Sequence, residues 1–137
     1  MTLFSAINAS GTGLTTYRTW IDVLANNVAN VNTARPTSGP AFQASYVEAQ
    51  EIAGGPDGIG QGVEITSLPQ GSAEGILTYQ PDNPLADENG YVRLPDIDMA
   101  EQMGNLIMAQ RGFQANAAVI DRAKDTYLQA INIGKNR

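Results

Sequence analysis

Two runs of apolar residues at heptad spacing, one at each end of the chain, set the strongest constraint on the fold. Steps of alternately four and three residues from Leu3 reach an apolar side chain at eight of nine positions, with Ser10 as the exception. The same steps after Met99 reach apolar side chains at seven of nine positions. Sustained heptad spacing predicts amphipathic helices, here roughly 45–50 Å long. The N-terminal seam is Leu3, Ile7, Leu14, Tyr17, Ile21, Leu24, Val28 and Val31; the C-terminal seam is Met99, Met103, Leu106, Phe113, Ala117, Ile120, Tyr127 and Ile131.

The segment between these runs has the composition of loops and short strands. Pro36, Gly39 and Pro40 require the first helix to end before them. Alternation of apolar residues predicts a strand over 41–52 with Phe42, Ala44 and Tyr46 on one face. Further strands are predicted from 63, at 76–79 and at 91–94, with turns at 54–62 and 80–90.

The predicted fold is therefore mainly α with a small β insertion. Long N- and C-terminal helices, within 1–33 and 98–137, pair as a coiled coil, and short strands and loops occupy 34–97. Asp96 or Asp98 is expected to cap the second helix.

The N-terminal helix is weak by intrinsic propensity. Glycine, threonine and asparagine, which are poor helix formers, fill most of the positions outside its seam. Such a segment becomes helical when a partner covers its seam. The partner is either the second helix of the same chain, in an ordinary two-helix coiled coil, or neighbouring subunits of an assembly. We favour the assembly, and expect both terminal segments to be largely unfolded in the free monomer.

Charge is concentrated in the middle of the chain. The formal net charge is −6 over 137 residues, and residues 34–97 hold nine acidic residues but only two basic ones. Two nearly neutral ends around an acidic middle indicate that the ends are covered, since exposed surfaces normally carry charge. The net negative charge argues against nucleic-acid binding.

The residues needed for most enzyme chemistry are missing or badly spaced. There is no Cys and no His, which excludes thiolate nucleophiles, histidine acid–base catalysis and Cys/His zinc sites. The glycines at 54–62 match neither common phosphate-binding motif, and 87–90 lacks the spacing of a calcium loop. We expect no catalytic residue, no cofactor and no metal. There is no run of about 18 apolar residues to insert in a membrane, and no basic residue before Arg18 to begin a secretory signal.

One local motif is unusual for the end of a helix, where a single cap would need only one asparagine. Four asparagines fall within seven residues, although asparagine is a poor helix former. An asparagine amide can cap helix carbonyl groups, and a buried asparagine can fix the register of paired helices. The motif comprises Asn26, Asn27, Ala29, Asn30, Asn32 and Thr33.

This motif resembles the asparagine-rich signature of the bacterial flagellar axial family of rod, hook and hook-junction proteins. A second resemblance lies in the C-terminal motif, at Gln110, Arg111, Gln114, Ala115 and Asn116, although Gly112 stands where the family commonly has Ala. A loop with Asn83, Pro84, Asp87, Asn89, Gly90 and Tyr91 is similar to a segment typical of a proximal-rod member. The resemblance covers nearly the whole chain and is loosest over 34–62.

The resemblance implies a structural subunit of the proximal rod of the flagellar basal body, which crosses the periplasm, transmits torque and encloses the export channel. It implies self-association and contacts with other rod subunits such as FlgB and FlgF, with the ring-to-rod adaptor FliE and with the flagellar type III export apparatus. Export would occur without a cleaved signal peptide. Two alternatives are another axial subunit of the family, and a soluble helical adaptor protein that is stable as a monomer or dimer.

Overall fold

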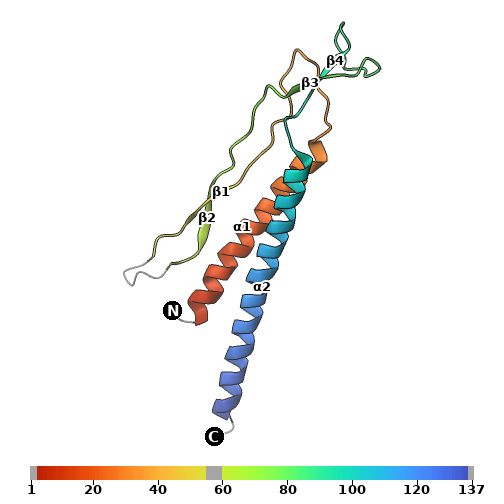
Figure 1. Cartoon of the computed structure of the whole chain (residues 1–137). Coiled ribbons are helices and arrows are strands. Elements are labelled where there is room, and N and C mark those ends of the chain that lie inside the picture. The colour runs from red at the N-terminus through yellow and green to blue at the C-terminus, as the bar shows by residue number, and fades with distance from the viewer. Residues whose placement is uncertain (1–2, 55–59, 136–137) are drawn as a thin grey trace.

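Two long antiparallel helices form the body of the molecule in this computed structural model, which describes residues 3–54 and 60–135. Helix α1 spans Leu3–Asn30 and helix α2 spans Met99–Lys135. With 28 and 37 residues they are about 42 and 55 Å long. Both chain ends lie at the same end of the pair, and α2 extends beyond the start of α1 (Figure 1). The presence of two long helices agrees with the prediction from heptad spacing.

Local hydrogen bonds fix the boundary of each helix. The carboxylate of Asp98 accepts hydrogen bonds from the backbone N–H groups of Ala100 and Glu101, at 2.8 and 3.1 Å. Asp98, rather than Asp96, is therefore the cap that begins α2. At the end of α1, the N–H of Thr33 donates to the carbonyl of Asn30 at 2.9 Å, and the chain leaves the helix before Pro36, as predicted.

The insertion consists of two separate two-stranded antiparallel sheets. Strand β1 (Glu48–Glu51) pairs with β2 (Val63–Ser67), and β3 (Ile76–Tyr79) pairs with β4 (Tyr91–Leu94). The bounds of β3 and β4 are those predicted from sequence. The turn predicted at 54–62 joins β1 to β2, and its residues 55–59 lie outside the described part of the chain.

The strand predicted over 41–52 was only partly correct. Within 41–52, regular strand pairing is confined to β1. Backbone N–H groups of Ala41 and Tyr46 donate to the carbonyl groups of Ala73 and Pro69, so the two segments stay side by side beyond the β1–β2 sheet. Pro69 has no N–H to donate, so it interrupts a regular ladder at this point. The residues predicted to share one face differ in exposure, since Ala44 is buried whereas Tyr46 is 45% exposed.

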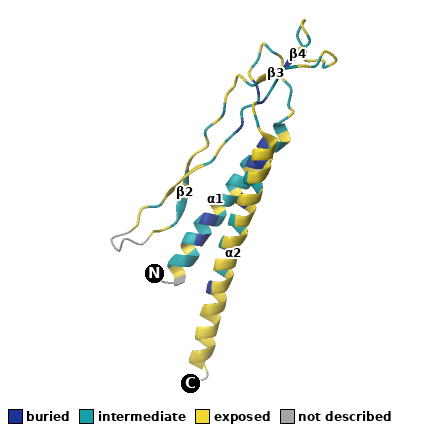
Figure 2. Ribbon diagram, in the orientation of Figure 1, coloured by how far each residue is buried: buried dark blue, intermediate teal, exposed yellow. Residues whose placement is uncertain are grey.

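Little of the molecule is buried. The buried apolar side chains in the helices are Leu24, Ala109 and Ala123, and those in the insertion are Ala41, Ala44 and Val92. In Figure 2 the side of α2 that faces away from α1 is exposed along nearly its whole length. Within residues 3–54 and 60–135, neither helix combines the length and the apolar character needed to cross a membrane.

Candidate assembly surface

The two helices meet through small and polar residues rather than through their most apolar ones. A Cβ atom at Gly13 would lie 2.7 Å from the side-chain oxygen of Asn116, and one at Gly112 would lie 2.4 Å from the ring of Tyr17. These distances are shorter than real Cβ contacts, so each glycine admits a side chain of the other helix. Van der Waals contact between closely packed helix backbones and side chains therefore stabilises the pair, while little apolar surface is buried.

A buried polar cluster joins the C-terminal end of α1 and the N-terminal end of α2 to the insertion. The side-chain amide of Asn27 donates to the backbone carbonyl of Ser45 at 2.8 Å and to Oε1 of Gln102 at 3.0 Å. Its carbonyl oxygen accepts from the N–H of Ser45 at 2.9 Å. Asn27 is 0% exposed and Gln102 is 3% exposed. Because every bond is specific in direction, the cluster fixes the register of α1 against α2 and the position of the insertion.

The other residues of the asparagine-rich motif act locally. Asn30 donates from its amide to the carbonyl of Asn26 at 2.9 Å, and its side-chain oxygen accepts from the hydroxyl of Thr33 at 3.1 Å. These bonds stabilise the last turn of α1. Asn26, Ala29 and Asn32 are exposed. The two roles considered for the motif, register and capping, therefore belong to different asparagines.

The hairpin formed by β1 and β2 covers one flank of α1. The hydroxyl of Thr12 accepts a hydrogen bond from the N–H of Val63 at 3.0 Å and donates to the carbonyl of Ala9 at 2.8 Å. Gly62, with φ of +116°, permits this approach, because a Cβ there would lie 2.0 Å from the Thr12 hydroxyl. A pocket of about 310 Å³ between α1 and the hairpin is lined by Thr16, Tyr17, Trp20, Val47, Ala49 and Val63.

The opposite flank of the helix pair carries the apolar stripes. Gly13 and Asn27 face α2, and the apolar residues Leu14 and Val28 each lie one residue later. On α2 the buried Gln102 is likewise followed by the exposed Met103. In both helices, moving one residue toward the C-terminus rotates the side chain away from the helix contact. Because the helices are right-handed and antiparallel, this rotation points both side chains to the same flank of the pair. We call this the apolar flank: Ile7, Leu14, Ile21 and Val28 of α1, with Met99, Met103 and Ala117 of α2.

The predicted seams divide between the helix contact and this flank. Of the N-terminal seam, Leu24 is buried, the side chain of Leu3 lies outside the described part, and the rest are half-buried: Ile7, Leu14, Tyr17, Ile21, Val28 and Val31. On α2, Leu106, Phe113, Ala117 and Ile120 are half-buried. The exposed fractions of Met99, Met103, Tyr127 and Ile131 are 40%, 46%, 47% and 37%.

Several contact residues were missed by the search for apolar residues. Gln102, Ala109, Asn116 and Ala123 follow one another at intervals of seven residues, and three of them are buried while Asn116 is half-buried. This series of small and polar residues lies one position before four positions reached by the heptad steps, of which Met103 and Ala117 belong to the predicted seam and Gln110 and Lys124 are its polar exceptions. Attention to small residues at heptad spacing would have found it.

Most of the C-terminal motif faces outward, since Gln110, Arg111, Gln114 and Ala115 are exposed. Asn116 is the member that contacts α1, beside Gly13. Its amide also donates to the carbonyl of Gly112 at 2.9 Å. The four exposed residues of this motif therefore face solvent in the isolated chain.

The loop between β3 and β4 is organised by Asp87. Its carboxylate accepts hydrogen bonds from the N–H groups of Tyr91 and Asn89, both at 2.9 Å, and from the hydroxyl of Thr37 at 3.1 Å. The bond from Tyr91, outweighing partial desolvation and aided by the other bonds, holds the pKa of Asp87 below its ordinary value of 3.8. Gly90, with φ of +82°, completes the turn, and the side chain of Asn83 bonds to that of Gln80. Pro84, Asn89 and Tyr91 are exposed.

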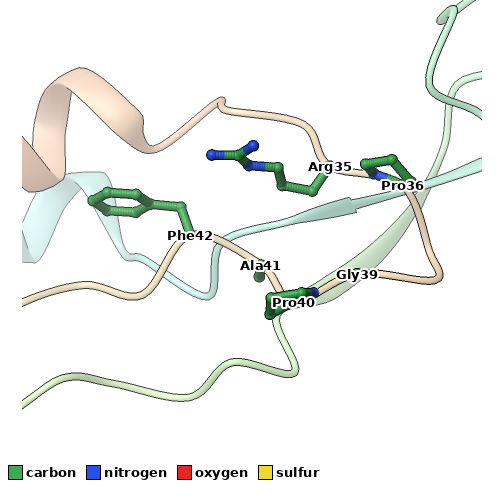
Figure 3. A pocket seen from close by; sticks show the side chains of 6 residues that line it. All are labelled: Arg35, Pro36, Gly39, Pro40, Ala41 and Phe42. Carbon is green, nitrogen blue, oxygen red and sulfur yellow. The ribbon is translucent and has the colours of Figure 1, made fainter.

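A pocket of about 360 Å³ lies where the chain leaves α1 (Figure 3). It is lined by Arg35, Pro36, Gly39, Pro40, Ala41 and Phe42. Arg35 and Arg93 exchange backbone hydrogen bonds of 2.8 and 2.9 Å, which fix this wall against β4. The lining contains no carboxylate or nucleophile, and the described residues include no group of three or more acidic side chains suited to a metal ion.

Comparisons with known proteins agree with these features. The family of flagella basal body rod proteins matches residues 7–37, and the C-terminal family of the flagellar basal body rod FlgEFG proteins matches residues 88–133. The flagellar basal-body rod protein FlgC of Borreliella burgdorferi is 38% identical, with 97% of this chain and 98% of that protein aligned. FlgC of Salmonella typhimurium is 33% identical, and FlgC of Bacillus subtilis is 28% identical; each is covered over its full length by 98% of this chain. The chain belongs to the FlgC family of flagellar basal-body rod proteins.

Proposed function

We propose that the chain is a structural subunit of the flagellar basal-body rod, which assembles with other rod components and has no enzymatic activity. The full-length similarity to FlgC proteins carries this proposal. The thin core and the apolar flank support it, because a molecule that stays alone in water does not benefit from apolar stripes on two helices. A soluble helical adaptor is not favoured by these relatives.

The helices α1 and α2 pair as a short antiparallel coiled coil in this proposal. The spacing of Leu24, Gln102, Ala109 and Ala123 is consistent with that packing. Residues 1–33 and 98–137 form the core that neighbours cover, and 34–97 forms the outer insertion. The apolar flank is the assembly seam, supported by the exposure of Met99 and Met103. Contacts that repeat without closing produce an open helical shaft, which can transmit torque around a central channel.

The proposed location is the proximal rod, where it crosses the periplasm. The neighbours would be further copies and the rod subunits FlgB and FlgF, with FliE joining the rod to the ring. The chain would reach this position through the flagellar type III apparatus without cleavage of a signal peptide. The proposed place in the proximal rod rests on the resemblance of the loop containing Asn83, Asp87 and Tyr91 to a segment of a proximal-rod member.

Aspartate substitutions on the apolar flank test the proposal in the bacterium that carries the chain. Leu14→Asp or Ile21→Asp should abolish incorporation into basal bodies and motility while secretion continues, because burying an unpaired charge costs several kcal/mol. Leu24→Asp should act similarly by disrupting the helix pair. Asn8→Asp adds the same charge at an exposed position of α1 and should assemble normally. Normal rods built from Leu14→Asp or Ile21→Asp would remove the apolar flank from the assembly.

Isolated basal bodies provide the direct measurement. A tagged copy should be found in the rod fraction, and crosslinking from exposed positions of α2 should capture FlgB, FlgF or FliE. Absence of the chain from purified basal bodies of a motile strain would overturn the proposed function.

A further inference from the structure

Asn89 is the only asparagine in the sequence that is followed by a glycine. It is exposed, in the loop between β3 and β4. Asparagine is a thermolabile residue, because the backbone nitrogen of the next residue can attack its side-chain carbonyl carbon. Glycine leaves that nitrogen unhindered, since it has no side chain. The Asn89–Gly90 pair is therefore the place in this sequence where an asparagine amide is most easily lost.

The reaction needs water as its only co-reactant. The backbone nitrogen of Gly90 bonds to Cγ of Asn89, the bond from Cγ to the amide nitrogen breaks, and ammonia leaves with the proton of the Gly90 N–H. Water then opens the cyclic imide at either of its two carbonyl carbons. Opening at Cγ gives aspartate. Opening at the main-chain carbonyl carbon gives isoaspartate, in which the main chain runs through Cβ and Cγ.

Asp87 holds the backbone on both sides of this reactive pair. The N–H of Gly90 donates to the backbone carbonyl of Asp87 at 2.9 Å, and the N–H groups of Asn89 and Tyr91 donate to its carboxylate, both at 2.9 Å. The carbonyl of Gly90 accepts from the N–H of Gln80 at 2.8 Å. The nitrogen that would have to attack Asn89 is therefore held by its own hydrogen bond. We call residues 87–91 the Asp87 turn.

The Asp87 turn is also fixed by contacts outside the loop. The hydroxyl of Thr37 donates to the second carboxylate oxygen of Asp87 at 3.1 Å. Gly90 has φ of +82°, and a Cβ there would lie 2.8 Å from the ring of Tyr79, so the backbone packs directly against β3. Rotation of the Asn89–Gly90 peptide group toward the Asn89 side chain would break the hydrogen bonds of both its N–H and the following carbonyl.

We propose that Asn89 is a deamidation site, and that the Asp87 turn protects it in the folded chain. The reaction proceeds from molecules in which the turn has opened. Because local opening and closing are fast compared with this slow chemistry, the rate follows the population of the open turn. The turn lies within one chain, so the protection does not depend on assembly into the rod.

The modification is expected to be one-way in its effect on the loop. Isoaspartate adds one carbon to the main chain before Gly90, which moves the N–H groups of Gly90 and Tyr91 away from Asp87. It also adds a carboxylate beside Asp82 and Glu88, which are already negative. A chain that reacts while its turn is open therefore loses the turn, and amide hydrogen exchange at Tyr91 should be faster in the isolated isoaspartate form.

Deamidation of the purified full-length chain tests the protection. The chain is incubated at mildly alkaline pH in native buffer and in urea, and mass spectrometry of the fragment that contains Asn89 measures the conversion of amide to acid. Conversion in native buffer should be about tenfold or more slower than in urea. Asn89→Gln should abolish the signal, because its longer side chain closes a less favourable ring. Equal rates in native buffer and in urea would overturn the proposal.

Substitutions in the loop show whether the protection comes from Asp87. In native buffer Asp87→Ala should raise the rate about tenfold, because it removes the hydrogen bonds to the carboxylate. Asp82→Ala removes an exposed carboxylate outside the turn and should react like the wild type. All three chains should react at one rate in urea, which excludes an effect of the substitution on the chemistry itself.

Thr37→Val gives a milder variant in case Asp87→Ala misfolds. It removes one hydrogen bond to the carboxylate and should raise the native rate about twofold to fivefold, while circular dichroism shows unchanged helix content. A folded Asp87→Ala chain that reacts as slowly as Asp82→Ala overturns the proposal. If Asp87→Ala does not fold, a wild-type rate for Thr37→Val overturns it.

Discussion

The side-chain amide of Asn27 in α1 donates a hydrogen bond of 3.0 Å to the side-chain oxygen of Gln102 in α2. The residues are 75 positions apart in the sequence, and both are buried. The same asparagine holds both backbone polar groups of Ser45, at the base of the insertion. One amide therefore connects three parts of a molecule whose apolar core is too thin to determine their arrangement.

Asn27→Ala should destabilise the folded chain by about 2–4 kcal/mol, because it leaves the buried polar groups of Ser45 and Gln102 without partners. Asn27→Asp keeps the shape but cannot donate either bond and buries a charge, so it should be at least as damaging. Urea unfolding followed by circular dichroism, at a concentration where the helices are formed, measures the effect. Asn32→Ala removes an exposed member of the same motif and should change stability by less than about 0.5 kcal/mol. Equal stability of Asn27→Ala and Asn32→Ala would show that the cluster does not hold the fold.

Gly112 in α2 leaves room for the ring of Tyr17 in α1. A Cβ at residue 112 would lie 2.4 Å from the Tyr17 ring, so Gly112→Ala should cost about 1–3 kcal/mol. In a Tyr17→Ala background, Gly112→Ala should no longer cost this stability, because the clashing ring is gone. A double-mutant cycle measures the coupling free energy between the two residues. Gly104→Ala is the control in the same helix. Nothing lies within 4 Å of a Cβ there, so alanine should stabilise by about 0.5–1 kcal/mol. Destabilisation by both alanines alike would argue against a specific clash with Tyr17.

The regular elements could be predicted from sequence because each has a strong local signal. The heptad spacing predicted both helices, the expected cap at Asp96 or Asp98 located the start of α2, and β3 and β4 appeared at the predicted residues. The strand predicted over 41–52 was only partly correct because its regularity depends on the partner segment, where Pro69 cannot donate a hydrogen bond.

The face of each helix that meets its partner could not be read from apolarity alone. The apolar pattern selected Met103 and Ala117, whereas the contact uses Gln102 and Asn116, one residue earlier. Close packing against Gly13 and Gly112 makes small and polar residues the better contacts here. Large apolar side chains such as Ile7, Leu14 and Met103 are left on the apolar flank, where a search for a monomer core would not place them.

Asp87 makes the loop between β3 and β4 sensitive to acid. Hydrogen bonds to its carboxylate, led by that from the N–H of Tyr91, lower its pKa in the folded chain. The ionised form therefore stabilises the loop above the unfolded pKa, and this contribution is lost as the pH falls through the lower folded pKa. The stability difference between the wild type and Asp87→Asn should be constant above about pH 5 and shrink below about pH 4. Amide hydrogen exchange at Asn89 and Tyr91 provides a local readout.

Glu88→Gln is the matched control for Asp87→Asn, because it removes a charge from an exposed neighbouring position. It should leave amide exchange at Tyr91 unchanged. A difference between wild type and Asp87→Asn that persists undiminished at pH 3 would contradict the role of the ionised carboxylate.

Dilution should unfold the helices of the free chain. Helices α1 and α2 together make up about half of the 137 residues when formed, yet their mutual contact buries chiefly small side chains such as Ala109 and Ala123. So little apolar burial does not offset the entropy of ordering two helices, one of them rich in glycine, threonine and asparagine. Circular dichroism of the dilute monomer should therefore report well under half helix, rising with concentration as neighbours cover the apolar flank. Gly11→Ala, at a position with open space, should raise the helicity of the dilute chain by favouring α1 alone. A dilute monomer that is already half helical would mean that the helix pair is stable without its neighbours, and that folding on assembly does not occur.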